Sequence, residues 1–360
     1  MTALSLGDNF RNSDIPVYRY IVISDFRYHG IPKSRNPSKY KTMAKKQDNI
    51  FYRALYYIIL VPGYAVSLLP MWWHYFWSDV LYLLIYRVVR YRRKVVRRNL
   101  TDSFPDKTEG ELRKVERDFY HYFCDLLVEA IKFISISREE MRCRMNFENI
   151  EPVIDSCQRG KNCAVYLGHY GNWEWISSMQ LWIDPKIGQC TQLYHPLENP
   201  AMDRLMGYIR QRMGDINIPV EQSVRHFVRY RQQGRPVLVG FIADQVPHWR
   251  NIHYWTNFLN HPKTPIFTGS ERLTRQFDMD AYYLHVTRPR RGYWNVRFVP
   301  MARDCKQTQE FEITELYTRL LEKNILEAPQ YWLWTHNRWK RTYEEWLVKK
   351  ESWEKKSTQS

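Results

Sequence analysis

The chain has 360 residues, of which 44% are hydrophobic and 26% are charged. This length and composition allow a folded core and exclude a disordered chain, a collagen and a small disulfide scaffold. The formal net charge of +16 and the aromatic fraction of 16% favour acidic partners: nucleic acid, anionic lipid, a phosphorylated substrate or an acidic carrier protein. The six cysteines lack metal-type spacing and predict reduced, buried thiols facing a cytoplasm.

The first 42 residues are polar and irregular, and they contain no apolar run of the kind that a signal peptide has. Met43 then opens "MAKKQDNIFYRALYYIILVPGY", which is typical of a natural start. We therefore expect residues 1–42 to be a dispensable polar extension, and disorder is one interpretation of it.

Residues 54–89 are strongly apolar and aromatic. The first part, "ALYYIILVPGYAVSLLPMWW", is about 20 residues long, which is enough to cross a hydrocarbon core. Pro62 and Gly63 interrupt it, so it either spans the bilayer or bends into one leaflet; a pair of buried core helices is the alternative. The basic "RYRRKVVRRNL" follows and indicates the cytoplasmic side, unless it is a solvated helix face. We predict a membrane anchor and a basic juxtamembrane segment over residues 43–100.

The rest of the chain predicts an α/β domain over residues 101–345, followed by a polar tail at 346–360. Thr108 and Glu111 have the spacing of a capping box and predict a helix over 108–134. Beyond residue 150, short apolar runs alternate with helical patterns, which predicts a parallel or mixed sheet flanked by helices. The expected strands are 163–168, 189–194, 236–243, 281–287 and 294–300, and the expected helices lie near 173–182, 198–212 and 221–233.

The stretch "AVYLGHYGNWEW" carries the main catalytic candidates, His169 and Glu174. Gly168 and Gly171 allow a sharp turn after a buried strand, and Asn172 is placed to cap the helix that follows. In one regular helix the two side chains would point roughly 140° apart, so they can face each other only if His169 lies in the turn. A carboxylate on one imidazole nitrogen would fix the tautomer, and the other nitrogen could deprotonate a hydroxyl that attacks an acyl carbonyl. A packed, hydrogen-bonded histidine is the alternative.

A second match to the same spacing, His74 with Asp79, lies inside the apolar region without a turn signal. We interpret it as a chance match, because about one such pair is expected in a chain of this composition.

The block "GHYGNWEW" closely resembles the His-x4-Glu block of the bacterial lipid A late acyltransferases, the lauroyl and myristoyl transferases. Three further blocks resemble the family in the same order: "RQRMG", which places Arg212 at the functional arginine, "PVLVGFIADQ", which ends at Asp244, and "YWLWTHNRWKR". The resemblance covers about residues 45–345. On residue type alone, Arg212 could stabilise an oxyanion or clamp a phosphate, or be a surface arginine, and Asp244 could be a site residue or a turn acid.

The resemblance implies a glycerolipid acyltransferase-like fold on the cytoplasmic side of the bacterial inner membrane. It implies transfer of a fatty acyl chain from acyl carrier protein, or acyl-CoA, to a hydroxyl of a phosphorylated lipid A precursor, with no metal or organic cofactor. His169 would be the general base, Glu174 its partner, and Arg212 and Asp244 would complete the site; His336 and Arg338 match the last block without a catalytic role.

The basic stretches 90–98 and 288–292 are expected to contact the lipid headgroup, anionic membrane lipids or the carrier protein, or to be generic solvated charge. Three other functions remain open at this point. The acceptor could be another glycolipid or a lysolipid, the protein could bind nucleic acid, or it could be a membrane scaffold that has lost its chemistry. The basic residues are not interleaved with aromatics as in an RNA-binding signature, which argues against nucleic acid.

Overall fold

The computed structural model describes residues 49–358, and the polar extension predicted at 1–42 lies outside them. The described residues from Phe51 onward form one compact unit, which holds every described strand. All six cysteines lie within the described residues; Cys143 is exposed and the other five are buried.

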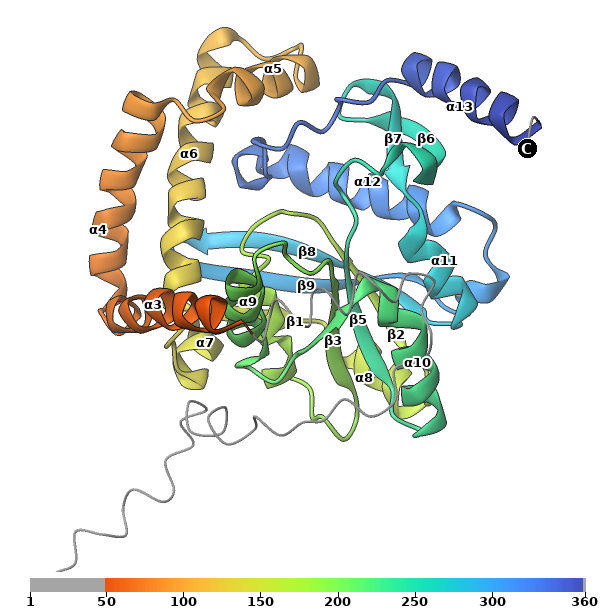
Figure 1. Ribbon diagram of the computed structural model, residues 1–360, viewed down its shortest axis with the longest axis horizontal. Coiled ribbons are helices and arrows are strands. Elements are labelled where there is room, and N and C mark those ends of the chain that lie inside the picture. Colours follow the sequence, from red (N-terminus) through yellow and green to blue (C-terminus); the bar gives the residue numbers. More distant parts are fainter. Residues whose placement is uncertain (1–48, 359–360) are drawn as a thin grey trace, which may run out of the picture. The chain divides into compact units, whose positions relative to one another are not determined.

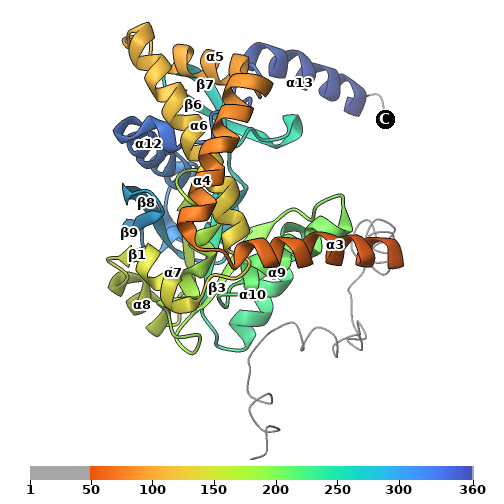
Figure 2. The same ribbon diagram turned by 90° about the vertical axis from the view of Figure 1, so that its left-hand side faces the viewer.

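Helices form the first part of the described chain. They are α3 (Ile50–Ser67), α4 (Met71–Tyr82) with its continuation as a π-helix, η1 (Leu83–Val89), α5 (Arg93–Ser103) and α6 (Glu109–Lys132). Figures 1 and 2 show α4 lying beside α6. Helix α6 confirms the predicted capping box, because Thr108 Oγ1 accepts from the Glu111 N–H and the Glu111 carboxylate accepts from the Thr108 N–H.

Helix α3 continues through Pro62, where the sequence predicts an interruption. A proline removes the hydrogen bond to the carbonyl four residues before it, here that of Ile58. The helix nevertheless continues to Ser67, so the loss of this one hydrogen bond does not end it.

The centre of the fold is a seven-stranded sheet, which confirms the predicted mixed α/β class. The strand order is β1-β9-β8-β2-β5-β3-β4, and β9 is antiparallel to β8 whereas the other neighbouring strands pair in parallel. Its strands are β1 (Met145–Glu148), β2 (Cys163–Leu167), β3 (Gln189–Tyr194), β4 (Ile216–Pro219), β5 (Val237–Ile242), β8 (Asp280–Arg290) and β9 (Tyr293–Ala302).

The five predicted strands correspond to β2, β3, β5, β8 and β9, and the sequence reasoning missed the two short edge strands β1 and β4. It also missed a separate antiparallel pair, β6 (Ile252–Phe258) and β7 (His261–Phe267), whose residues are polar and aromatic rather than aliphatic. The remaining helices of seven residues or more are α7 (Arg138–Arg144), α8 (Glu151–Gln158), the 3-10 helix η2 (Trp175–Leu181), α9 (Pro200–Gln211), α10 (Ser223–Gln232), α11 (Gly269–Gln276), α12 (Glu312–Glu327) and α13 (Tyr343–Thr358). Helix α13 occupies the stretch that the sequence suggests is a polar tail.

Helices cover both faces of β2, all of whose residues are buried. On one face, Cys163 lies 3.9 Å from Cys157 of α8. On the other face, the Tyr166 hydroxyl lies 2.8 Å from Thr274 Oγ1 of α11, and the Tyr317 hydroxyl of α12 donates to the Leu167 carbonyl. This burial on two sides explains why β2 has a continuous apolar sequence and why chemistry can begin only where the strand ends.

Candidate active site

His169 and Asp244 occupy equivalent places at the ends of two neighbouring strands. Strands β2 and β5 are parallel, with Leu167 opposite Ile242, and each site residue follows two positions later. The carboxyl ends of adjacent parallel strands meet at one sheet edge, so the two side chains lie together. His169 Nδ1 is 2.6 Å from Asp244 Oδ1, and the His169 backbone N–H donates to Asp244 Oδ2 at 2.8 Å.

Trp332 is a third member of this group, which sequence reasoning missed although the block that contains it was noted. Its indole N–H donates to Asp244 Oδ2 at 2.8 Å. The backbone around it pairs with the turn, because the Gly171 N–H donates to the Tyr331 carbonyl and the Leu333 N–H donates to the His169 carbonyl. The C-terminal segment thus holds the His169 turn and orients its acid at the same time.

The turn that was predicted between Gly168 and Gly171 is present, and both glycines are required by space. A Cβ on Gly168 would lie 2.7 Å from Leu321 and 3.3 Å from Asp244 Oδ2. Gly171 has a φ of +61°, and a Cβ there would lie 2.6 Å from Val286. The backbone can therefore approach Asp244 and β8 only because these two positions lack side chains.

The imidazole is accessible on one side, whereas its acid is enclosed. The His169 side chain is 19% exposed and that of Asp244 is 2% exposed. Burial alone raises the pKa of the Asp244 carboxyl, but the positive charge of His169 and hydrogen bonds from His169 and Trp332 outweigh burial and lower this pKa to about 2. The Gln245 side-chain nitrogen, which is exposed, lies 3.2 Å from His169 Nε2 and marks the open side of the ring.

Glu174 does not contact the imidazole, contrary to the expectation from sequence. Its carboxylate forms a two-pronged ion pair with Arg210, with Nε to Oε2 at 2.8 Å and Nη2 to Oε1 at 2.6 Å. Asn172 is not the N-cap that the sequence suggests, because η2 begins at Trp175 with Glu174 at its N-cap; the Asn172 side-chain oxygen nevertheless accepts from the Trp175 N–H at 3.0 Å. Asp244, which follows the neighbouring strand β5, occupies Nδ1 of the imidazole instead.

Arg212 also differs from expectation in its surroundings. Its guanidinium donates to the Phe133 and Ile136 carbonyls, where it satisfies backbone groups just after the end of α6. Burial lowers the pKa of this arginine. The arginine two positions earlier in the same "RQRMG" segment, Arg210, is the one that reaches Glu174. Both arginines lie in that segment, and the family resemblance alone favours Arg212.

Two residues of the C-terminal block lie close enough to Asp244 for their charges to interact. Burial lowers the pKa of His336 to about 4, and burial lowers the pKa of Arg338 to about 10, with Asp244 opposing each shift. Arg338 is 1% exposed and donates to the Pro265 carbonyl on β7. The Arg338 contact joins the C-terminal block to the β6–β7 pair.

Some arginines of the basic stretches form ion pairs within the protein, whereas others are exposed. Arg93 and Arg97 pair with Glu116 of α6. In the 288–292 stretch, Arg288 and Arg291 both pair with Asp125 of α6. His74 and Asp79 do not form a catalytic pair in the structure, because His74 is buried and Asp79 pairs with Arg291.

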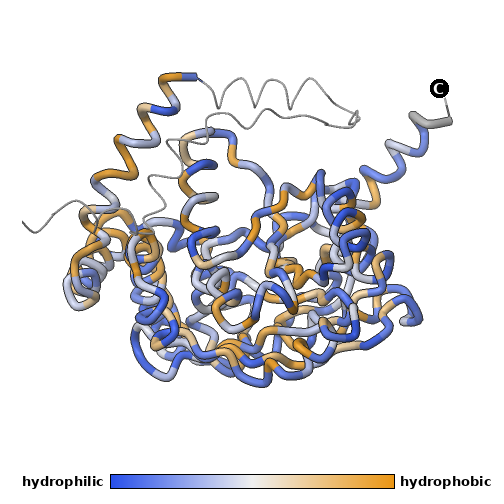
Figure 3. The backbone as a smooth tube through the Cα atoms, turned by 90° about the horizontal axis from the view of Figure 1, so that it is seen from below, coloured by the Kyte–Doolittle hydropathy of each residue, from blue (hydrophilic) through white to orange (hydrophobic). Residues whose placement is uncertain are grey.

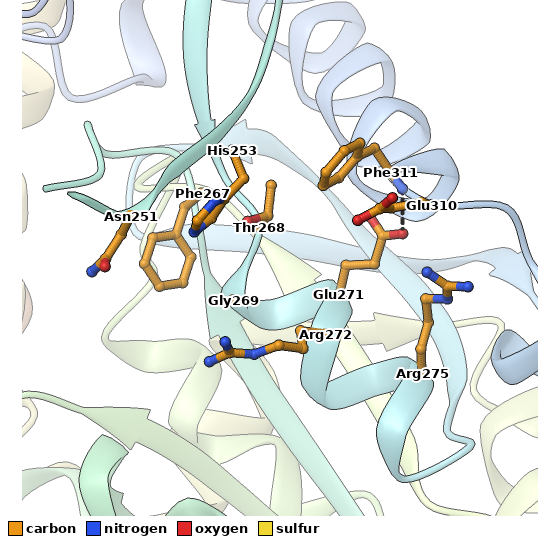
Figure 4. Close-up of a pocket in the computed structure, with 10 residues that line it drawn as sticks. All are labelled: Asn251, His253, Phe267, Thr268, Gly269, Glu271, Arg272, Arg275, Glu310 and Phe311. Carbon is orange, nitrogen blue, oxygen red and sulfur yellow. Dashed lines mark hydrogen bonds between the residues drawn. The ribbon is translucent and has the colours of Figure 1, made fainter. Parts of the chain in front are cut away.

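A cavity of about 430 Å³ lies among β6, β7, α11 and the start of α12 (Figure 4). None of the four predicted site residues lines it. Both carboxylate oxygens of its buried acid, Glu271, accept hydrogen bonds from backbone N–H groups, those of Phe311 and Thr314. The lining also holds equal numbers of arginines and glutamates, so its formal charges balance. It is therefore a weaker candidate for chemistry than the edge where His169 lies.

Comparison with known proteins accords with this geometry. No curated protein matches the chain in a sequence search. Residues 43–341 match the family model described as bacterial lipid A biosynthesis acyltransferase, which covers the helical segment, the sheet and Trp332. The chain therefore belongs to the bacterial lipid A biosynthesis acyltransferase family and is an acyltransferase enzyme of lipid A biosynthesis.

Proposed function

We propose that this enzyme moves a fatty acyl chain from acyl carrier protein, or from coenzyme A, to a hydroxyl of a phosphorylated lipid A precursor, with His169 as the general base. The observation that carries the proposal is the 2.6 Å contact between His169 Nδ1 and the buried Asp244 carboxylate. A low pKa keeps this acid ionised at neutral pH, so it accepts the Nδ1 hydrogen and leaves the Nε2 lone pair directed outward.

The chemistry follows from that tautomer. Nε2 takes the proton from the acceptor hydroxyl as its oxygen attacks the thioester carbonyl, and a tetrahedral oxyanion forms. Collapse of this intermediate breaks the carbon–sulfur bond, and the departing thiolate takes the proton back from the imidazolium. The Gln245 amide occupies the place of the acceptor hydroxyl at Nε2; because Gln245 is exposed, it can move aside. The products are an ester and a free thiol, and the reaction uses no metal or organic cofactor.

The opposite charges of enzyme and substrates support these partners. Acyl carrier protein is acidic and the acceptor bears phosphates, whereas the chain carries a net charge of +16. Charge of this kind accelerates encounter and holds anionic partners at the surface. Arg90, Lys94 and Arg290 are exposed basic residues of the two stretches named above, and we propose that they contact headgroups or the carrier.

The same proposal places the enzyme on the cytoplasmic side of the inner membrane through α3 and α4. Among the described residues, α3 is the one helix long and apolar enough to cross a membrane, with a mean hydropathy of 1.3 (Figure 3). Apolar side chains are exposed along both helices, which suits contact with lipid rather than water. They include Phe51, Ile58 and Val61 on α3 and Trp72, Phe76 and Trp77 on α4.

The test is acyl transfer by wild-type enzyme and by His169→Ala in membranes, with lauroyl-, myristoyl- and palmitoyl-loaded acyl carrier protein and an underacylated lipid A precursor. Loss of a general base lowers the rate by about 10²–10⁴-fold. Mass spectrometry of lipid A and other glycolipids, from cells with and without the gene, identifies the chain and the acceptor. Undiminished turnover by a folded His169→Ala enzyme would refute the proposal, and an acyl chain missing from another glycolipid instead would change the acceptor.

A further inference from the structure

We infer that Glu129, on α6, is a positioning residue that holds the turn carrying His169 in its reactive geometry; this inference rests on the proposed role of His169. Glu129 is 0% exposed, and its Oε2 accepts a hydrogen bond from the Asn172 side-chain nitrogen at 2.6 Å. Asn172 lies three positions after His169 in the same turn. The contact therefore joins a rigid helix directly to the segment on which the base depends.

The same two residues also fix where the turn ends. The Asn172 side-chain oxygen accepts from the Trp175 backbone N–H at 3.0 Å, and the Trp175 indole N–H donates to the Glu129 backbone carbonyl at 3.1 Å. Glu129 thus holds the turn twice, once through its carboxylate and once through its backbone. Rotation of the turn about its glycines would have to break both contacts.

A third contact from α6 reaches the middle of the turn. The Tyr122 hydroxyl donates to the Gly171 carbonyl at 2.7 Å. Tyr122 and Glu129 are seven residues apart, which places them about two turns apart on the same face of a helix. Gly171 adopts a left-handed conformation and lacks a side chain that would restrict its backbone. The bond to its carbonyl therefore limits rotation of the peptide that follows Gly171.

The Glu129 carboxylate has polar partners besides Asn172. Its second oxygen accepts from the Tyr75 hydroxyl at 2.8 Å, and Arg288 Nη2 lies 3.9 Å away. Burial raises the pKa of this carboxyl to about 7, with Arg288 acting in the opposite direction. Enclosing a carboxylate is costly, and an apolar side chain would fill the space at less cost, but it could not hold Asn172.

The expected consequence is on rate rather than on binding. A displacement of the imidazole by a fraction of an ångström misaligns Nε2 with the acceptor hydroxyl, and reaction rates depend steeply on such alignment. Glu129 itself is fully buried and is not a catalytic residue. Its removal should therefore lower kcat and leave the KM for the acyl donor nearly unchanged.

The experiment compares Glu129→Ala, Glu129→Gln and Asn172→Ala in the full-length enzyme in membranes, with acyl-loaded carrier protein as donor. We expect Glu129→Ala and Asn172→Ala each to lower kcat by at least about tenfold. Glu129→Gln should retain most activity, because its amide oxygen can accept from Asn172 and its amide N–H can donate to the Tyr75 oxygen. The double variant should be no slower than either alanine variant alone, since both remove one contact.

Retention of wild-type kcat by folded Glu129→Ala or Asn172→Ala would overturn the inference, and so would a change in KM without a change in kcat. If Glu129→Ala fails to accumulate in membranes, Asn172→Ala still decides the question, because it removes the same hydrogen bond and leaves the Glu129 side chain in place. His169→Ala is measured in the same assay. Full activity of that variant refutes the proposed function, whereas loss in His169→Ala together with full activity in the Glu129 and Asn172 variants refutes only the inference.

Discussion

The two ends of one turn show different kinds of acid contact. At its start, His169 meets Asp244, which comes from a neighbouring strand and is 2% exposed. At its end, Glu174 meets Arg210 from α9, and both side chains remain about one-fifth exposed, at 18% and 23%. The first contact orients a group that can move a proton, and the second is a two-pronged ion pair. Closeness in sequence suggests Glu174 as the acid that pairs with His169, whereas the pairing of β2 with β5 places Asp244 there.

The largest effect expected from this comparison is on catalysis by Asp244→Asn. The amide keeps the shape of the acid but cannot hold the Nδ1 hydrogen as a carboxylate does, so the wrong imidazole tautomer becomes accessible. We expect kcat to fall by about 10²–10⁴-fold, measured as single-turnover acyl transfer. Glu174→Gln is the matched control and should remain within about tenfold of wild type. The reverse ranking of the two variants would make Glu174 the partner of the base.

A second expected effect concerns stability in acid. The pKa of Asp244 is lowered from 3.8 to about 2, so the stability that this acid contributes is present above about pH 4 and is lost as the pH falls toward 2. The loss should be about 2–3 kcal/mol. Unfolding of wild type and Asp244→Asn in detergent, measured between pH 7 and pH 2, tests it, since the variant should lack this component. Parallel stability curves for the two proteins would contradict the ionised state of Asp244.

The smallest expected effect concerns the pair at the other end of the turn. Glu174→Ala leaves Arg210 partly buried without its acid, and should lower the free energy of unfolding by about 1–3 kcal/mol. Arg210→Ala should cost a similar amount. The double variant should cost less than the sum of the two, because removal of both ions leaves no uncompensated charge. Additive losses in thermal unfolding would mean that the two side chains do not act as a pair.

Much of the fold could be predicted from the sequence because its signals are local. The capping box at Thr108, the five central strands and the turn between Gly168 and Gly171 all depend on residues within a few positions of one another. Strand order is not local. Strands β2 and β5 are neighbours although β3 and β4 lie between them in the chain, and no periodicity reveals which acid will lie beside His169.

The same limit explains the other differences at the site. Arg210 and Arg212 are two positions apart, and only the way α9 packs decides which of them reaches Glu174 and which satisfies carbonyls after α6. Trp332 and Glu129 reach the site from segments that lie far from His169 in the sequence. The edge strand β4 and the β6–β7 pair lack the aliphatic runs that reveal buried strands, so their sequences gave no comparable signal.

The most direct test of the account is nitrogen-15 NMR of the His169 imidazole in enzyme labelled at histidine, with His169→Ala used for assignment. The account predicts a hydrogen on Nδ1 bonded to Asp244, with a strongly downfield Nδ1 proton that disappears in Asp244→Asn and persists in Glu174→Gln. A signal that survives in Asp244→Asn and disappears in Glu174→Gln would contradict it.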